Sequence, residues 1–348
     1  MKGEVIVRGG ATQVGGPPQD PAIVVDTDLP SHITILRDPY PHFYKCLDVS
    51  RVLEWQRDAS ALNNRNDDFG PDGAGGRGTH YINAQTPSSM ARSKGIEGLL
   101  RLITRELGVT NGIVLDLLGG DGLVHKVANQ LQLSNLNVLT CDISEHMIQA
   151  ACDARVPAIH QRAERLLCKD GSVDGVLLAY GTHHIDPSDR SFAFQEAHRV
   201  LRPGGVFVIH DFEVGGPMDK WFGEVVDIQS RTGHPFRHFA RSDIDDYFSA
   251  AGFKDYRIID MTDSYCAVGD TPEEARLAMG EYLTDMYGLV KVEEAKGRNG
   301  AAYWALEKAR EIFGHTEGAA DPTFDPATGI WRMEVPRSAL VGVAIRRS

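Results

Sequence analysis

Two acidic residues and a cluster of glycines between positions 114 and 142 have the spacing of a nucleotide-binding turn. Asp116 lies at the end of an apolar run, and three of the four residues from Gly119 to Gly122 are glycine. Glycine lets the backbone approach a ligand closely, and the free N–H groups at the start of a following helix bind anionic groups. Asp142, at the end of the next apolar run, is placed to accept hydrogen bonds from ribose hydroxyls. These residues predict a cofactor that carries a ribose.

The glycine turn does not fit the dinucleotide-binding fingerprint. That fingerprint continues with a third glycine or alanine. In this chain Gly122 is followed by Leu123, Val124 and His125. A dinucleotide cofactor is therefore disfavoured, and a glycine turn beside a surface acid, without a ligand, is the other alternative.

These residues need a framework of strands and helices to position them, and the sequence supplies one. Strands are expected at short apolar runs, and helices where apolar residues recur every three to four positions. The expected strands cover 113–117, 137–141, 158–160, 174–180, 205–210, 256–261 and 340–345. The expected helices cover 93–107, 122–131, 144–151, 192–201, 220–229, 242–251, 272–287 and 301–313. This alternation predicts an α/β fold: a Rossmann-like, mainly parallel sheet of about seven strands with flanking helices, an N-terminal helical extension and a late helical insertion.

The segments outside this framework define three parts of the chain. Residues 1–30 are expected to be a loosely held arm, 39–56 a helix and 58–78 a polar, glycine-rich loop. We divide the chain into an N-terminal arm and helical or lid region (1–92), a Rossmann-like domain (93–265), and a helical insertion with a final strand that completes the sheet (266–348). The late helices either cover the substrate or serve packing and oligomerisation, and a homodimer is compatible with them.

Five ordered motifs between about Asn111 and Phe212 resemble those of the class I S-adenosylmethionine (SAM)-dependent methyltransferases. They are Asp116-Leu117-Leu118-Gly119-Gly120-Asp121-Gly122, Asp142-Ile143-Ser144-x-x-Met147, Gln161-Arg162-Ala163-Glu164-Arg165-Leu166, Asp170-Gly171-Ser172-Val173-Asp174 and His198-Arg199-Val200-Leu201-Arg202-Pro203-Gly204-Gly205. The chain departs from the family pattern at Leu118, where a glycine is usual, and at Arg162, which replaces an acid.

The resemblance implies that SAM is the cofactor and which residues bind it. The first motif would face the methionine end, the second the ribose and the third the adenine. The cofactor-binding residues implied in this way are Asp116, Gly119, Gly120, Asp121, Gly122, Asp142, Ile143, Met147, Arg162, Ala163 and Tyr180.

Histidines that follow predicted strand ends are the candidate catalytic residues. Methyl transfer is an in-line displacement, so catalysis comes largely from orienting the acceptor, and a base is needed only when the acceptor must lose a proton. The candidate bases are His183, His184 and His210. Asp211 is not expected to orient His210, because neighbouring side chains of a strand point to opposite faces. Packing, capping or closing the cofactor pocket is the alternative role of each histidine.

Four further residues are candidate substrate contacts: Tyr81, Glu213, His234 and His238. Tyr81 belongs to a segment that is expected either to form a lid or to supply a core aromatic. His234 and His238 could also join His210 or Asp211 in a metal site, which would suit C-methylation of a 2-oxo acid through its enolate. No ligand spacing is diagnostic, however, so we assign no residue as a metal ligand.

Composition narrows the class of acceptor. The formal net charge is -12, and no basic recognition arm occurs, so a nucleic-acid partner is not expected. No apolar run is long enough to cross a membrane. The five cysteines form no CxxC pair, and no secretory apolar segment follows Met1, so a cytoplasmic protein with reduced thiols is expected.

The sequence therefore favours a SAM-dependent methyltransferase whose acceptor is a small molecule. An aromatic or heterocyclic compound or a 2-oxo acid of specialised metabolism is the expected acceptor. The alternatives are a metal-assisted C-methyltransferase of a 2-oxo acid and a non-catalytic SAM-binding regulatory module, which the departures at Leu118 and Arg162 motivate.

Overall fold

A seven-stranded sheet forms the centre of the computed structural model, which describes residues 29–62, 67–85, 91–108, 111–133, 136–314 and 321–348. Its strands are β1 (Gly112–Leu117), β2 (Leu136–Asp142), β3 (Ala158–His160), β4 (Val173–Ala179), β5 (Leu201–Asp211), β6 (Asp255–Thr262) and β10 (Ser338–Ile345). They lie in the order β3-β2-β1-β4-β5-β10-β6. Strands β1 to β5 pair in parallel, and β10 is antiparallel to both β5 and β6. The predicted fold class, a mainly parallel sheet of about seven strands, is confirmed.

Helices cover both faces of this sheet, because alternate residues of its strands are apolar on both sides. On one face, Val114 and Val208 belong to a core shared with α5 (Ser93–Leu107) and α6 (Leu123–Gln130). On the other face, Leu115 and Ile209 share a core with α8 (Arg190–Val200) and α11 (Arg241–Ala250). Helix α7 (Glu145–Asp153) packs on β2 and β3, and the Ser144 hydroxyl caps it by accepting a hydrogen bond from the backbone N–H of Met147.

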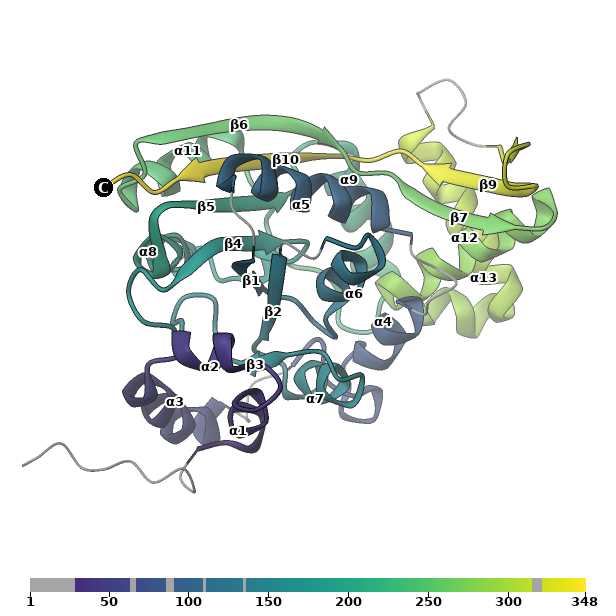
Figure 1. Cartoon of the computed structure of the whole chain (residues 1–348). Coiled ribbons are helices and arrows are strands. Elements are labelled where there is room, and N and C mark those ends of the chain that lie inside the picture. Colours follow the sequence, from purple (N-terminus) through teal and green to yellow (C-terminus); the bar gives the residue numbers. More distant parts are fainter. Residues whose placement is uncertain (1–28, 63–66, 86–90, 109–110, 134–135, 315–320) are drawn as a thin grey trace, which may run out of the picture.

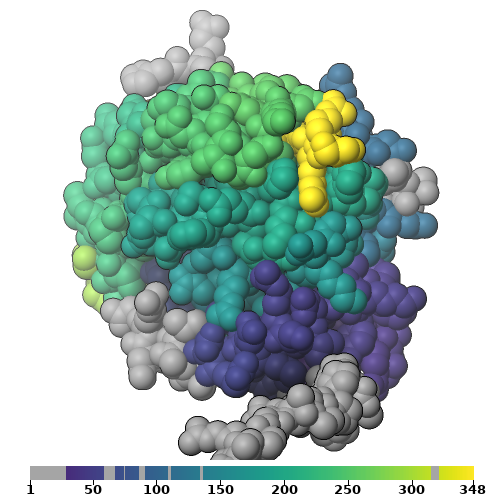
Figure 2. Space-filling view, turned by 90° about the vertical axis from the view of Figure 1, so that its left-hand side faces the viewer, coloured from purple at the N-terminus to yellow at the C-terminus, as the bar shows by residue number. Residues whose placement is uncertain are grey.

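The N-terminal region contains three helices where the sequence predicted one. They are α1 (Ser31–Leu36), α2 (Pro41–Cys46) and α3 (Val49–Leu62), and they lie beside β3 (Figure 1) and form the lower part of the face in Figure 2. The predicted helix over 39–56 is interrupted because Asp48 accepts hydrogen bonds from the backbone N–H groups of Ser50 and Arg51, which starts a new helix. The loop expected from residue 58 therefore begins later. The expected arm over 1–30 lies almost wholly outside the described residues.

The glycine-rich region that follows is more structured than expected. It contains a 3₁₀ turn (Asp72–Ala74) and α4 (Gly78–Ala84). Between β5 and β6 lie α9 (Pro217–Trp221), a π-helical turn (Phe222–Val226) and α10 (Asp227–Gln229), where one helix over 220–229 was expected.

The late segment builds a lobe that the sequence predicted only in part. Helices α12 (Pro272–Tyr287) and α13 (Val290–Phe313) pack together, and α13 begins earlier than expected and is kinked at Gly297, whose φ is 72°. A second sheet of β7 (Tyr265–Gly269), β9 (Ile330–Val335) and β8 (Thr323–Asp325) accompanies them. Figure 1 shows this lobe at the edge of the main sheet toward which β4 and β6 point. Ligands of such sheets bind beyond that edge.

None of the helices in the described part of the chain combines the length and the apolar character that a membrane span requires.

Candidate active site

The turn from β1 to α6 adopts a backbone path that largely requires glycine. Gly120 and Gly122 have φ values of 58° and 86°, in the left-handed region that side chains disfavour. A Cβ on Gly119 would lie 2.7 Å from Oδ2 of Asp116. Leu118 also adopts a left-handed φ of 61° although it is not glycine. The departure from the family motif at Leu118 thus leaves the backbone in a conformation that glycine also favours.

Asp142 connects this turn, the glycine loop (Leu118–Gly122), to the end of β2. Its Oδ2 accepts a hydrogen bond from the backbone N–H of Gly120 at 2.8 Å, and its Oδ1 accepts one from Ser144 at 2.9 Å. Each oxygen keeps a lone pair for a further donor. Burial raises the pKa of Asp142 to about 6. Next to it, the side chain of Ile143 is exposed, whereas that of Met147 is fully buried.

Two carboxyl oxygens below the glycine loop are buried without a partner. They are Oδ2 of Asp116 and Oδ1 of Asp121, and neither has a hydrogen-bond partner in the described part of the chain. Burial, and then the proximity of Asp142, raises the pKa of Asp116 well above its usual value. The other oxygen of Asp121 pairs with Lys126 at 2.5 Å. Buried oxygens of this kind call for polar ligand atoms, such as the amino and hydroxyl groups of SAM.

The residues predicted to frame the adenine are differently engaged. Ala163 is buried. The guanidinium of Arg162 forms an ion pair with Glu164 and lies 3.7 Å from Asp189. Its charge is therefore already compensated within the protein, so any contact with adenine would come from its planar face or from the backbone. An adenine-binding role for Arg162 and Ala163 stays a prediction.

A cavity that we call the aromatic chamber adjoins the glycine loop. Its lining residues come from α4 and the segment before it, the residue before α5, the ends of β4 and β5, the π-helical turn, the late lobe and the residue before β10. They are Phe69, Arg77, Tyr81, Arg92, Tyr180, His183, His184, Phe212, Phe222, Tyr265, Met286, Tyr287 and Arg337. A smaller cavity along the glycine loop is lined by Asp116, Leu118 and Gly119, and it shares Tyr81, Arg92 and Tyr180 with the chamber. A cofactor on the glycine loop would therefore adjoin an acceptor in the chamber.

Arg92 lies in the wall that the two cavities share. Its side chain donates a hydrogen bond to the Tyr81 hydroxyl at 2.7 Å, and its guanidinium carbon lies 4.8 Å from the centre of the Tyr180 ring. The residue is 5% exposed and has no carboxylate partner within 4 Å in the described residues. A buried cation without an acid is a binding site for an anionic ligand group. Sequence reasoning missed Arg92, since a single arginine before a helix gives no signal.

His183 is held by a buried carboxylate. It lies in a 3₁₀ turn (Thr182–His184) after β4, and its Nδ1 donates a hydrogen bond to Asp211 of β5 at 2.9 Å. Burial alone would raise the pKa of Asp211, but the neighbouring His183 lowers this pKa to about 2. The hydrogen bond at Nδ1 leaves the lone pair of His183 on Nε2.

Three more histidines surround His183. The ring centres of His184, His234 and His238 lie 4.5, 5.0 and 4.8 Å from that of His183. Burial, and then the proximity of His183, lowers the pKa of all three; that of His234 falls to about 2. These three imidazoles are therefore neutral near pH 7. His183, His184, His234 and His238 are called the histidine cluster below.

His210 is separate from this cluster. Its Nε2 donates a hydrogen bond to Asp263 at 3.1 Å, and its ring packs 4.2 Å from that of Tyr180. Tyr180 lines the chamber and also donates its hydroxyl hydrogen to Asp263, at 3.1 Å. His210 is fully buried and is not among the residues that line the chamber. As the sequence indicated, Asp211 does not orient His210. A catalytic role for His210 stays a prediction.

The candidate substrate contacts are also distributed unequally. Tyr81 lines the chamber, and His234 and His238 belong to the histidine cluster. The side chain of Glu213, in contrast, is exposed. The structure also adds residues from the late lobe, Tyr265, Met286 and Tyr287, to the chamber wall. No spacing along the chain could have indicated these, because the lobe reaches the chamber only through tertiary packing.

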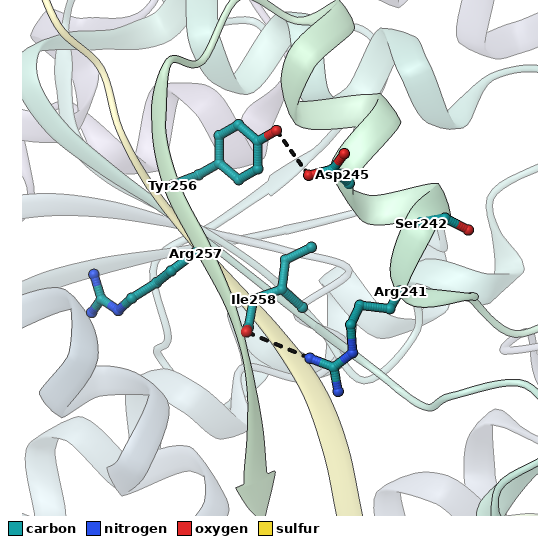
Figure 3. Close-up of a pocket in the computed structure, with 6 residues that line it drawn as sticks. All are labelled: Arg241, Ser242, Asp245, Tyr256, Arg257 and Ile258. Atoms are coloured by element: carbon teal, nitrogen blue, oxygen red, sulfur yellow. Dashed lines mark hydrogen bonds between the residues drawn. The ribbon is translucent and has the colours of Figure 1, made fainter.

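A larger hollow lies elsewhere, between α11 and β6 (Figure 3). It has a volume of about 460 Å³, against about 40 Å³ for the chamber. Its charged side chains are already paired: Arg241 with Asp260 at 2.5 Å, and Arg257 with Glu106 at 2.7 Å. Both arginines of this hollow are paired, and the edge strand β6 is separated from β1 by β4, β5 and β10, so the chamber is the better candidate for the active site.

Comparison with known proteins identifies the central segment. Residues 115–209 match a family model described as a methyltransferase domain. An uncharacterized methyltransferase of Mycobacterium tuberculosis is 35% identical over 130 residues, which cover 36% of this chain and 49% of that protein. A ubiquinone/menaquinone biosynthesis C-methyltransferase of Hahella chejuensis is 29% identical over 153 residues, 41% of this chain and 60% of that protein. The chain spans about half the length of the curated relatives it matches.

Two solved structures align with part of this chain. The phosphoethanolamine N-methyltransferase 2 of Haemonchus contortus in complex with SAM has 17% identity and a TM-score of 0.48, with 78% of this chain and 56% of that chain covered. The YcgJ protein of Bacillus subtilis has 18% identity and a TM-score of 0.46, with 72% and 99% covered.

The sheet order, the glycine loop and the family match define a methyltransferase domain. This domain is similar to the class I SAM-dependent methyltransferases, whose cofactor is SAM, so the resemblance seen in the motifs is confirmed over residues 115–209.

Proposed function

We propose that the whole chain transfers a methyl group from SAM to a small-molecule acceptor bound in the aromatic chamber. The observation that carries this proposal is the wall of Tyr81, Arg92 and Tyr180, which is shared by the chamber and the cavity along the glycine loop. Bound SAM supplies an electrophilic methyl group on a sulfonium. The protein's part is then to hold the acceptor in line with that group and to exclude water.

The residues in and beside the glycine loop suit SAM because several of their carboxyl oxygens can accept further hydrogen bonds. Asp142 keeps lone pairs for the ribose hydroxyls, and the buried oxygens of Asp116 and Asp121 suit the amino group of the methionine portion. The other cofactor-binding residues named from the motifs remain part of this proposal.

We also keep as a proposal the division of the chain into the parts 1–92, 93–265 and 266–348.

The chamber's chemistry suggests the class of acceptor. Its aromatic walls suit a flat or apolar body. The guanidinium of Arg92 bonds the Tyr81 hydroxyl but has no carboxylate partner among the described residues, so it suits a carboxylate of the acceptor. We infer an acidic acceptor, either a 2-oxo acid or an aromatic acid of specialised metabolism. When such an acceptor must lose a proton, His183 and His184 are the histidines that line the chamber and could accept it. The charge of -12 makes a nucleic-acid acceptor a poor alternative.

Incubation of the full chain with SAM and a panel of small acids tests this proposal. The panel contains 2-oxo acids, aromatic acids and their neutral amides, and the readout is S-adenosylhomocysteine together with the mass of a methylated product. We expect product from an acid and much less from its amide. Absence of SAM binding by calorimetry would refute the proposal. Binding without turnover on any acceptor would favour the regulatory module.

The variant Arg92→Ala tests whether Arg92 binds the carboxylate of the acceptor or the carboxylate of SAM. We expect the acceptor KM to rise about 10- to 100-fold, since a hydrogen bond to a charged group contributes about 1.5–3 kcal/mol. The Kd of SAM should change little. A loss confined to SAM affinity would place Arg92 on the cofactor instead. Arg241→Ala, whose guanidinium is paired with Asp260 away from the chamber, is the matched control.

A further inference from the structure

The histidine cluster gathers more Lewis bases than proton transfer needs. It combines His183 and His184, from the turn after β4, with His234 and His238, from the segment between α10 and α11. The His183 and His234 ring centres lie 5.0 Å apart, and those of His184 and His234 lie 5.3 Å apart. A single imidazole suffices for a general base, so four neighbouring rings call for another explanation.

Four ring nitrogens of the cluster are buried and unpaired. Nε2 of His183, Nε2 of His238 and both ring nitrogens of His234 have no hydrogen-bond partner in the described part of the chain. The side chain of His183 is 1% exposed, so its Nε2 is shielded from bulk solvent. A buried polar atom without a partner costs about 1–3 kcal/mol. Several such atoms at one place indicate a ligand that they share.

Carboxylates orient two of these rings from behind. Asp211 accepts the Nδ1–H of His183 at 2.9 Å, and Asp219 accepts the Nδ1–H of His238 at 2.7 Å. Histidines that bind metals commonly donate their other ring N–H to a carboxylate, which fixes the tautomer and makes the free nitrogen more basic. The unpaired Nε2 atoms of these two rings have this arrangement.

We propose that His183, His184 and His234 bind a divalent first-row transition-metal ion at the wall of the aromatic chamber. Their ligand atoms lie within 4.8 Å of one another. Small ring rotations would bring them to the separation that metal–nitrogen bonds of about 2.1 Å require. Imidazole ligands without carboxylate or thiolate favour zinc, iron, cobalt or nickel over magnesium or calcium.

A second grouping, of His183, Asp211 and His238, also has its ligand atoms within 4.8 Å. It is the poorer site because Asp211 already accepts hydrogen bonds from three donors. Its oxygens accept the Nδ1–H and the backbone N–H of His183, and the backbone N–H of Phe212. Two members of the first grouping, His183 and His184, line the chamber, whereas only His183 of the second grouping does. Asp211 is thus a residue that positions His183 rather than a metal ligand.

Three protein ligands leave coordination positions open toward the chamber. An acceptor with two adjacent oxygens, such as a 2-oxo acid, could occupy them. This part of the inference rests on the proposed methyl transfer, whereas metal binding itself does not, so the two can fail independently.

Metal binding is tested on the full chain without turnover. The protein is purified without chelator and its metal content is measured by elemental analysis. Metal-free protein is then titrated with Co²⁺, whose visible absorption reports nitrogen coordination. We expect one metal ion per chain, lost in His183→Ala, His184→Ala and His234→Ala. Asp211→Asn should bind about 10- to 100-fold more weakly. His198→Ala, a histidine packed on Phe253 outside the cluster, should bind normally.

Several outcomes would overturn the proposal. These are less than one tenth of an equivalent of metal together with no Co²⁺ spectrum, or an unchanged spectrum in His234→Ala. Loss of Co²⁺ in His238→Ala with normal binding in His184→Ala would assign the metal to the other grouping instead. SAM affinity and the midpoint of thermal unfolding of each variant show whether it is folded. If metal binds but no acceptor yields S-adenosylhomocysteine, the proposed function fails and the metal site stands.

Discussion

At the scale of single residues, the proposed binding of SAM depends on the free lone pairs and the protonation state of Asp142. Asp142 holds the glycine loop through the backbone N–H of Gly120 and still has lone pairs for a ribose. Its raised pKa of about 6 follows from burial. Because this pKa exceeds that of an unfolded chain, the carboxyl lowers the free energy of unfolding as the pH rises from about 4 to 6. Ribose hydroxyls bind the ionised form and so recover part of that cost.

We therefore expect SAM affinity to depend on the ionisation of Asp142. The Kd should rise as the pH falls from 7 to 5, because the carboxyl takes up a proton near pH 6. Asp142→Asn should weaken binding about 10- to 100-fold at pH 7 and flatten the pH dependence. Calorimetric titration at several pH values measures both effects. Asp153→Asn, on the exposed side of α7, is the control and should match the wild type. An equally steep pH profile in Asp142→Asn would contradict this account.

At the scale of elements, the late lobe depends on close contact between α12 and α13. A Cβ on Gly280 of α12 would lie 2.4 Å from the backbone oxygen of Ala302 in α13. The two helices can approach this closely only because residue 280 has no side chain. Since Met286 and Tyr287 at the end of α12 line the chamber, the helix contact also sets part of the acceptor site.

Gly280→Ala is expected to destabilise the protein although alanine favours helices. The backbone overlap should cost about 1–3 kcal/mol, against a gain of about 1 kcal/mol in helix propensity. Gly223→Ala is the matched control, because a Cβ there meets nothing within 4 Å, and it should be neutral or slightly stabilising. Thermal unfolding of both variants compares the signs. An equal rise in midpoint for both would show that the helices separate at little cost.

At the scale of the whole molecule, one buried ion pair connects the main sheet to the lobe. Arg337, just before β10, pairs with Asp263, just after β6, at 2.6 Å, and both side chains are almost fully buried. Asp263 also accepts hydrogen bonds from Tyr180 and His210. Asp263 lies between β6 and β7, and Arg337 lies between β9 and β10, so the pair sits where the chain passes from one sheet to the other. Through Tyr180 the pair also contacts the wall of the chamber.

Removing one member of this pair should leave an uncompensated buried charge. We expect Arg337→Leu to lower the free energy of unfolding by about 3–5 kcal/mol, and Arg337→Leu/Asp263→Asn to recover part of the loss. Arg347→Leu removes an exposed pair with Asp255 and should change stability by about 1 kcal/mol or less. Urea unfolding curves of the set decide the question. Wild-type stability of Arg337→Leu would mean that water or rearrangement compensates Asp263.

The sequence by itself determined the sheet and the cofactor half of the site. Apolar periodicity placed the central strands and α5, and the glycine loop and Asp142 are local motifs whose neighbours in space are near neighbours in the chain. The sequence was wrong about the single helix over 39–56, where Asp48 starts a new helix, and it missed the second sheet, whose strands are short and partly polar. These failures have one origin: short elements are selected by the surface they pack on rather than by their own pattern.

Only the tertiary structure decided the acceptor half. His183 is 28 residues from Asp211 and 51 from His234, and Arg92 is 245 residues from Arg337. No spacing rule connects such positions, because side chains at the ends of different strands meet only when the sheet order brings those ends together. The packing of the late lobe against that edge then encloses them and removes water. The histidines of the cluster have buried ring nitrogens without hydrogen-bond partners because the fold brings them together and covers them. Both effects are properties of the folded chain.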